Sequence, residues 1–177
     1  MSIKKTIITI TSLFIVMLFL SASSCNKKKE MSSINTENWT KRKAKTKLSD
    51  SLEYGKSYLS IYSEIYSMSE HKTHNLTSMI SLRNTSDTDT IYVLKANYFD
   101  THGKLVRSYF DHIIYLAPME TAEIIIDEKD KTGGTGSNFI FEWKTPKNCP
   151  EPLFEGIMNS TVGQQGLSFA TQAKRIK

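Results

Sequence analysis

The fold is decided by the stretch Phe139-Ile140-Phe141-Glu142-Trp143-Lys144. Large aromatic side chains occupy every second position, and smaller or charged side chains lie between them. A two-residue repeat is typical of a β-strand with one face in a hydrophobic core. Three aromatic rings on one face predict that this strand packs between two sheets, with Trp143 as a core residue.

The same alternation recurs after Tyr54, for example where Tyr92, Leu94, Ala96 and Tyr98 are expected to share the inward face. About eight short strands are expected, with turn signals every eight to twelve residues. They are Leu59–Ile65, Leu76–Arg83, Ile91–Phe99, Lys104–Phe110, Ala122–Ile126, Phe139–Trp143, Glu155–Ser160 and Leu167–Gln172. The pattern predicts an all-β protein, a single antiparallel β-sandwich of immunoglobulin-like type.

Two connections carry signals of their own. Asp100-Thr101-His102-Gly103 joins two expected strands, and its Asp and Gly favour a tight turn, so a hairpin is expected there. The one helical candidate covers Thr46–Gly55, where Ser49 or Ser51 would cap a short turn.

The N-terminus has the order of a bacterial secretory signal. Lys4 and Lys5 form the positive region, Ile7–Leu20 the apolar region, and Ser21–Ser24 the small-residue cleavage site. Cys25 follows directly, which resembles the lipobox of bacterial lipoproteins, where the thiol accepts a diacylglyceryl group. We therefore expect residues 1–24 to be a lipoprotein signal peptide and Cys25 to be the acylated N-terminus, carrying palmitate-type chains.

This lipobox departs from the common pattern, because Ala22 stands where Leu is usual. Ordinary cleavage without lipidation therefore remains an alternative. An uncleaved anchor is disfavoured, because the apolar run is shorter than the roughly 20 residues that cross a bilayer. Asn26 rather than Asp follows the cysteine, which by resemblance to Gram-negative sorting favours the outer membrane on its periplasmic side.

Charge divides the mature chain into two parts. Residues 26–47 hold eight basic and two acidic side chains, whereas residues 48–177 hold thirteen basic and sixteen acidic ones. Residues 25–53 are expected to form a basic, flexible tether beside anionic headgroups, and residues 54–177 the sandwich domain. Because the domain is mildly acidic, a nucleic-acid partner is excluded.

Residues that carry chemistry are sparse in the domain. Cys149 is its one cysteine, so no internal disulfide can form, and we interpret it as an ordinary loop residue. His71 and His74 stand beside Glu70 in an expected polar connection, but a zinc site needs a third ligand. No metal, cofactor or catalytic residue is predicted.

The long connection between Ile126 and Phe139 is the strongest candidate for a site. Its glycines free the backbone to present N–H and C=O groups, and its acidic residues offer the hard oxygen ligands that calcium prefers. A plain sheet-connecting loop remains the alternative. The candidate ligand-binding residues are Asp127, Asp130, Gly133, Gly134, Gly136 and Asn138.

A second segment framed by glycines, Gly163-Gln164-Gln165-Gly166, precedes the last long strand. The amides of Gln164 and Gln165 suit sugar or peptide recognition and are added to the candidate site. A simple hairpin turn is the alternative interpretation.

Several motifs occur together in a fixed order. They are Ile61–Tyr66, Ser81–Thr85, Tyr98–Tyr109, Leu116–Pro118, Asp130–Phe139 with Trp143, and Gly163–Phe169. Together they resemble a bacterial exported family of unknown function, DUF3124, over roughly Tyr54–Ile176. The resemblance implies export and a single compact domain, and it brings no activity, substrate or catalytic residue.

Three functions remain open after these observations. The first is an envelope binding or scaffolding module, joined to the membrane by its lipid and to an unknown protein or small-molecule ligand. The second is an enzyme acting on envelope polymers, with Asp130 and Glu155 as the acid/base pair. The third is an ion-binding envelope protein that uses the acidic glycine loop.

Overall fold

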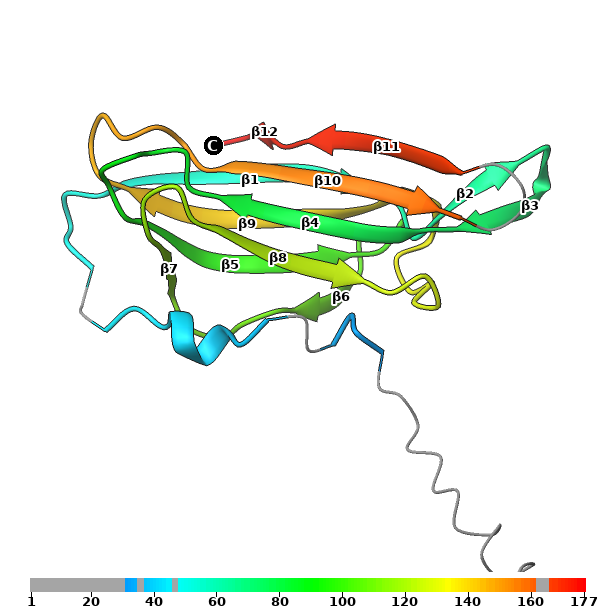
Figure 1. The fold of residues 1–177 in the computed structure, drawn as a ribbon, viewed down its shortest axis with the longest axis horizontal. Coiled ribbons are helices and arrows are strands. Elements are labelled where there is room, and N and C mark those ends of the chain that lie inside the picture. Colours follow the sequence, from blue (N-terminus) through cyan, green and yellow to red (C-terminus); the bar gives the residue numbers. More distant parts are fainter. Residues whose placement is uncertain (1–30, 35–36, 46–47, 162–165) are drawn as a thin grey trace, which may run out of the picture. The chain divides into compact units, whose positions relative to one another are not determined.

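Apolar side chains at alternate positions give each long strand one buried face, and in the computed structural model two antiparallel sheets pack through these faces (Figure 1). The structure describes residues 31–34, 37–45, 48–161 and 166–177. The first sheet has the order β12 (Lys174–Arg175), β1 (Glu53–Ile61), β9 (Ser137–Thr145), β5 (Ile91–Phe99) and β6 (Leu105–Ser108), with β7 (Ile114–Leu116) also paired to β5. The second has the order β11 (Leu167–Gln172), β10 (Leu153–Ser160), β4 (Thr77–Arg83) and β8 (Thr121–Ile126).

The prediction of an all-β antiparallel sandwich is confirmed, and the arrangement is compatible with an immunoglobulin-like one. β5 and β11 have the bounds that the sequence predicts, and β5 forms the expected hairpin with β6. The inward face predicted for β5 is correct for Ala96 and Tyr98 but wrong for Tyr92 and Leu94, because an irregularity between Val93 and Lys95 turns Ile91 and Val93 inward instead.

The core is centred on the aromatic face of β9, as expected. Phe139, Phe141 and Phe154 stack, with ring centroids 5.4 Å and 4.1 Å apart for successive pairs. Trp143 is only 1% exposed, and its indole N–H donates to Ser57 Oγ at 3.0 Å. This bond satisfies the one polar atom of the buried ring, so Trp143 is a core residue.

The structure differs from the sequence prediction in three places. The helix expected over Thr46–Gly55 is wrong, because β1 already begins at Glu53 and residues 50–51 form a turn. The expected strand Leu59–Ile65 divides into β1 and β2 (Glu64–Ser67), because the buried Ser63 turns inward to bond Tyr98. β2 pairs with β3 (Ser69–Asn75), a strand where a polar connection was expected.

Part of the segment expected to be a spacer lies against the sandwich. The N-terminal strap, residues 37–45, contains the 3-10 helix η1 (Trp39–Arg42) and passes beside β7 (Figure 1). Its Trp39 ring packs 5.1 Å from that of Phe110, and the Ala44 N–H donates to the Ile113 carbonyl at 2.9 Å. The compact unit extends from Met31 to Lys177, so it begins upstream of the boundary expected at Tyr54.

Two further contacts hold the strap against the sandwich. Arg42 Nη1 lies 2.6 Å from the Glu120 carboxylate, and Lys43 forms a β-bridge with Ile114. In the part of the chain that the structure describes, no helix is long and apolar enough to cross a bilayer.

Candidate functional site

Asp130, at the centre of the predicted glycine loop, turns its carboxylate into the protein. The side chain is 0% exposed, and its Oδ2 lies 3.0 Å from Arg107 Nη2. Its Oδ1 accepts from the Thr132 hydroxyl at 2.6 Å and from the Thr132 N–H at 3.2 Å. Burial alone would raise the pKa of Asp130, but the bonds from Thr132 and Arg107 outweigh it and lower that pKa. The Asp130 carboxylate is therefore charged, and its bonds to Thr132 and Arg107 hold the loop against the protein.

The three glycines of this loop pack it against the hairpin turn between β5 and β6. The Gly133 carbonyl accepts from both the N–H and the hydroxyl of Thr101, each at 3.0 Å. The Gly136 N–H donates to the same hydroxyl at 2.9 Å. Gly134 has φ +72°, a conformation that favours glycine, and its carbonyl accepts from Ser63 N–H at 3.1 Å. The backbone groups expected to face a ligand are thus bonded within the protein.

The remaining predicted residues lie around this loop. Asp127 directly follows β8, and its Oδ1 accepts the N–H of Lys129 at 3.0 Å. Asn138 is a half-buried residue within β9, which pairs there with both β1 and β5. Gln164 and Gln165 lie outside the described residues. The structure thus brings Asp130 and the glycines together and places Asp127 and Asn138 at the two ends of the connection.

The acid/base pair of the enzyme hypothesis does not converge. Glu155 lies on β10 and pairs with Arg83, whose Nε is 2.9 Å from the carboxylate. Asp130 pairs instead with Arg107, on a different element. Among the residues that the structure describes, no three His, Cys, Asp or Glu side chains are grouped to hold a metal ion.

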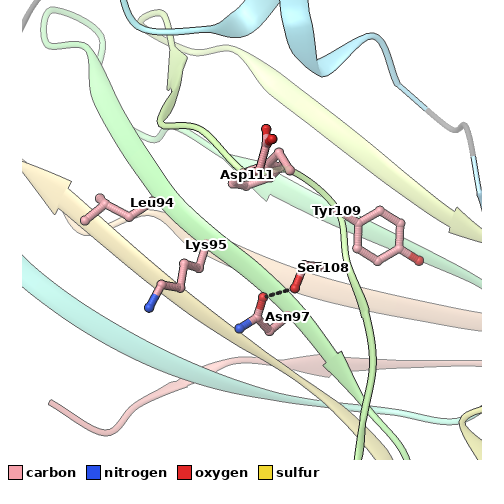
Figure 2. Close-up of a pocket in the computed structure, with 7 residues that line it drawn as sticks. Leu94, Lys95, Asn97, Ser108, Tyr109 and Asp111 are labelled. Carbon is pink, nitrogen blue, oxygen red and sulfur yellow. Dashed lines mark hydrogen bonds between the residues drawn. The ribbon is translucent and has the colours of Figure 1, made fainter.

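A groove that the sequence analysis did not predict lies just after β6. Two adjoining hollows of about 530 and 600 Å³ share Tyr109, Phe110 and Asp111, and together we call them the Tyr109 groove. One hollow is walled by β5 and the end of β6 (Figure 2), through Leu94, Lys95, Asn97 and Ser108. The other is walled by His112 and by residues 37–40 of the N-terminal strap.

The rim of the Tyr109 groove carries exposed polar groups. The Asp111 side chain is 98% exposed, and the hydrogen bond that links it to His112 at 2.8 Å lowers its pKa. Lys95 is about half exposed and lies 3.2 Å from Glu142. Asn97 accepts from the Ser108 hydroxyl at 2.9 Å (Figure 2). At neutral pH the groove therefore presents a carboxylate, an ammonium group and an amide to solvent.

Two nearly buried aromatic residues, Tyr109 and Phe110, line the groove, and Tyr109 is joined to the glycine loop. Burial raises the pKa of Tyr109 to about 12, so its hydroxyl stays protonated. Arg107 donates to that hydroxyl at 3.1 Å while its other terminal nitrogen bonds Asp130. His112 Nε2 lies 3.0 Å from the Trp39 carbonyl, and this contact holds the strap beside the groove.

One local signal marked this groove in the sequence. Tyr109-Phe110-Asp111-His112 places two aromatic residues next to two polar ones at the end of an expected strand. The second wall has no such signal, because residues 37–40 lie about seventy positions upstream and were expected to belong to a spacer. Loops that carry binding residues on a rigid frame are often assembled in this way.

Comparison with known proteins identifies a family and brings no activity. No curated protein and no solved structure matches the chain. A family model described as a protein of unknown function, DUF3124, matches residues 54–176, which is the region where the motifs resemble that family. The match spans most of the chain and includes the sandwich, the glycine loop and one wall of the groove, so the chain belongs to the DUF3124 family.

Proposed function

We propose that this protein is a lipid-anchored binding module of the cell envelope, held in the outer membrane through Cys25 and taking a ligand in the Tyr109 groove. The anchor rests on the order of the N-terminal regions and on the position of Cys25. Stable anchoring needs at least two acyl chains, which a diacylglyceryl group supplies.

The observation that carries the binding role is the groove itself. Tyr109, Phe110 and Trp39 line it together with the exposed groups of Asp111 and Lys95. Small-molecule sites combine a mainly apolar surface with a few polar groups that orient the ligand. This chemistry fits a polar molecule with one apolar face, such as a saccharide from an envelope polymer.

The glycine loop enters this proposal as a support and not as the surface that touches the ligand. Arg107 binds Asp130 of the loop and the Tyr109 hydroxyl of the groove. Through these bonds the loop holds Tyr109 in one position. A binding site that is ordered in advance loses less conformational entropy when a ligand binds.

The anchor is tested by fractionating cells that express Cys25→Ser, with Cys149→Ser as the matched cysteine control. The Cys25→Ser protein is expected in the soluble periplasmic fraction or as uncleaved precursor, and Cys149→Ser in the membrane fraction. A processed Cys25→Ser protein that stays in the membrane pellet would refute lipid anchoring.

The groove is tested by titrating soluble fragments of envelope glycans while following tryptophan fluorescence. Trp39 lines the groove, whereas Trp143 is 1% exposed, so a spectral change that disappears in Trp39→Phe reports on the groove. Asp111→Asn should weaken the response, and Asp87→Asn, an exposed aspartate outside the groove, should leave it unchanged. Equal affinities for these two variants would contradict the proposal.

A further inference from the structure

We infer that the sandwich has a defined membrane-facing end, built from the β5–β6 turn (residues 100–104) and the glycine loop (residues 127–136), and that its exposed lysines contact anionic phospholipid headgroups. This inference rests on the proposed lipid anchor at Cys25. Three observations support it: where the packed chain begins, how far that point lies from Cys25 in sequence, and which charges surround it.

The chain becomes part of the sandwich at Ser33. This side chain is 0% exposed, and its Oγ accepts the Asp127 N–H at 2.7 Å. Arg107 donates to the Ser33 carbonyl at 3.4 Å, and the Ser32 hydroxyl donates to the Asp127 carboxylate at 3.2 Å. The packed chain therefore begins beside the end of β8 and the strand β6.

The sequence leaves little length between that point and the anchor. Seven residues separate Cys25 from Ser33. Eight Cα–Cα steps of an extended chain reach at most about 28 Å, and less when the chain is not fully extended. A lipidated Cys25 therefore keeps this end of the sandwich close to the bilayer surface, rather than on a long tether.

The exposed charged side chains of the turn and the loop are basic. Lys104, Lys129 and Lys131 are all exposed and lie in the turn or in the loop, which are joined through Thr101. Lysines close to an anionic bilayer are attracted to its headgroups. Lys27-Lys28-Lys29 in the connecting segment adds positive charge of the same kind.

The acidic groups at this end are engaged in the fold. Asp100 accepts from two N–H groups of its own turn, Asp130 pairs with Arg107, and Asp127 bonds Ser32 and Lys129. Glu128 is half-buried. Within the turn and the loop, the exposed charged side chains are thus the three lysines, which an anionic surface would attract. The neighbouring β2–β3 hairpin adds one exposed charge of each sign, Glu70 and Lys72.

The opposite end of the sandwich supplies a matched control. β9 runs from the glycine loop at Ser137 to Thr145, and Lys147 lies in the turn after it. Nine residues of extended strand span about 30 Å, so Lys147 is separated from the proposed membrane face by roughly that length.

The test uses the mature lipoprotein, purified from membranes and reconstituted in vesicles of phosphatidylethanolamine and phosphatidylglycerol. In a Cys149→Ser background, His102→Cys or Lys147→Cys is labelled with a fluorophore, and the lipids carry a headgroup quencher. His102 is an exposed residue of the turn, and its replacement keeps all three lysines. Quenching is expected to be several-fold stronger at position 102 than at position 147.

The charge contribution is measured with Lys104→Gln, Lys129→Gln and Lys131→Gln combined. This variant should lower the quenching at position 102, and zwitterionic phosphatidylcholine vesicles should do the same to the parent protein. Equal quenching at positions 102 and 147, or stronger quenching at 147, would overturn the membrane-facing end. Co-sedimentation with vesicles reports on the anchor separately, so its loss would count against the proposed function and not against the orientation alone.

Discussion

The glycine loop and the Tyr109 groove are both rich in polar residues, but they use them in opposite ways. In the loop, the Asp130 carboxylate is 0% exposed and bonds Arg107 and Thr132. In the groove, the Asp111 carboxylate is 98% exposed. Polar composition therefore does not distinguish a group that closes a loop from a group that is available to a ligand.

The largest difference is expected between two aspartates. Asp130→Ala should lower the free energy of unfolding by about 3 kcal/mol, because it leaves the mostly buried Arg107 without its carboxylate partner. Asp111→Ala should leave stability essentially unchanged, because that side chain is exposed. Urea unfolding of both variants measures the effect, and similar losses would remove the contrast between loop and groove.

A smaller loss is expected from one methyl group inside the loop. A Cβ at Gly133 would lie 1.8 Å from the hydroxyl of Tyr98, whose ring is fully buried. Gly133→Ala should therefore cost about 1–3 kcal/mol, the usual range for overpacking. Gly136→Ala is the control, because its nearest atom would be 3.4 Å away. Thermal melting should separate the two variants; a Gly133→Ala protein as stable as Gly136→Ala would show that the loop is loosely packed.

The loop should also make the domain sensitive to acid. The pKa of Asp130 is lowered in the folded protein, so its contribution to stability is present at neutral pH and is lost as the pH falls through that lowered value. Asp130→Asn should flatten the decline of melting temperature below about pH 4, the range where a free aspartate titrates. An unchanged slope in Asp130→Asn would show that other carboxylates determine the acid sensitivity.

The smallest effect is expected at the wall of the groove that the N-terminal strap forms. His112→Ala removes the bond to the Trp39 carbonyl, and a single hydrogen bond contributes about 1 kcal/mol. Trypsin should then cut the N-terminal strap at Lys41–Lys45 faster, while global unfolding changes little. His102→Ala, in an exposed turn, serves as the control. Equal cleavage of the two variants would mean that His112 does not hold the strap.

The long strands could be predicted because their information is local. β9 shows the two-residue alternation over nine residues, and its buried positions follow it. In β5 an irregularity between Val93 and Lys95 shifts the buried face, which no local repeat indicates. β7 has only three residues, too few for a period to be recognised. The strap could not be predicted either, because its packing depends on Phe110 and Glu120, residues far downstream.

The candidate site shows the same limit. The glycine loop was recognised from composition. The partner of its Asp130 carboxylate, Arg107, lies 23 residues away and gives no local signal. The aromatic residues after β6 were present in the sequence, but the wall opposite them comes from residues 37–40. Long-range pairing therefore determines which polar groups remain accessible.

The β-bridge between Lys43 and Ile114 bears on self-association. β7 lies at the edge of its sheet, and an uncovered strand edge can pair with the edge of another molecule. Lipid anchoring would confine many copies to one plane, where such encounters are frequent. The N-terminal strap, which ends in basic residues, occupies the outer side of β7. It therefore blocks this route to edge-to-edge aggregation.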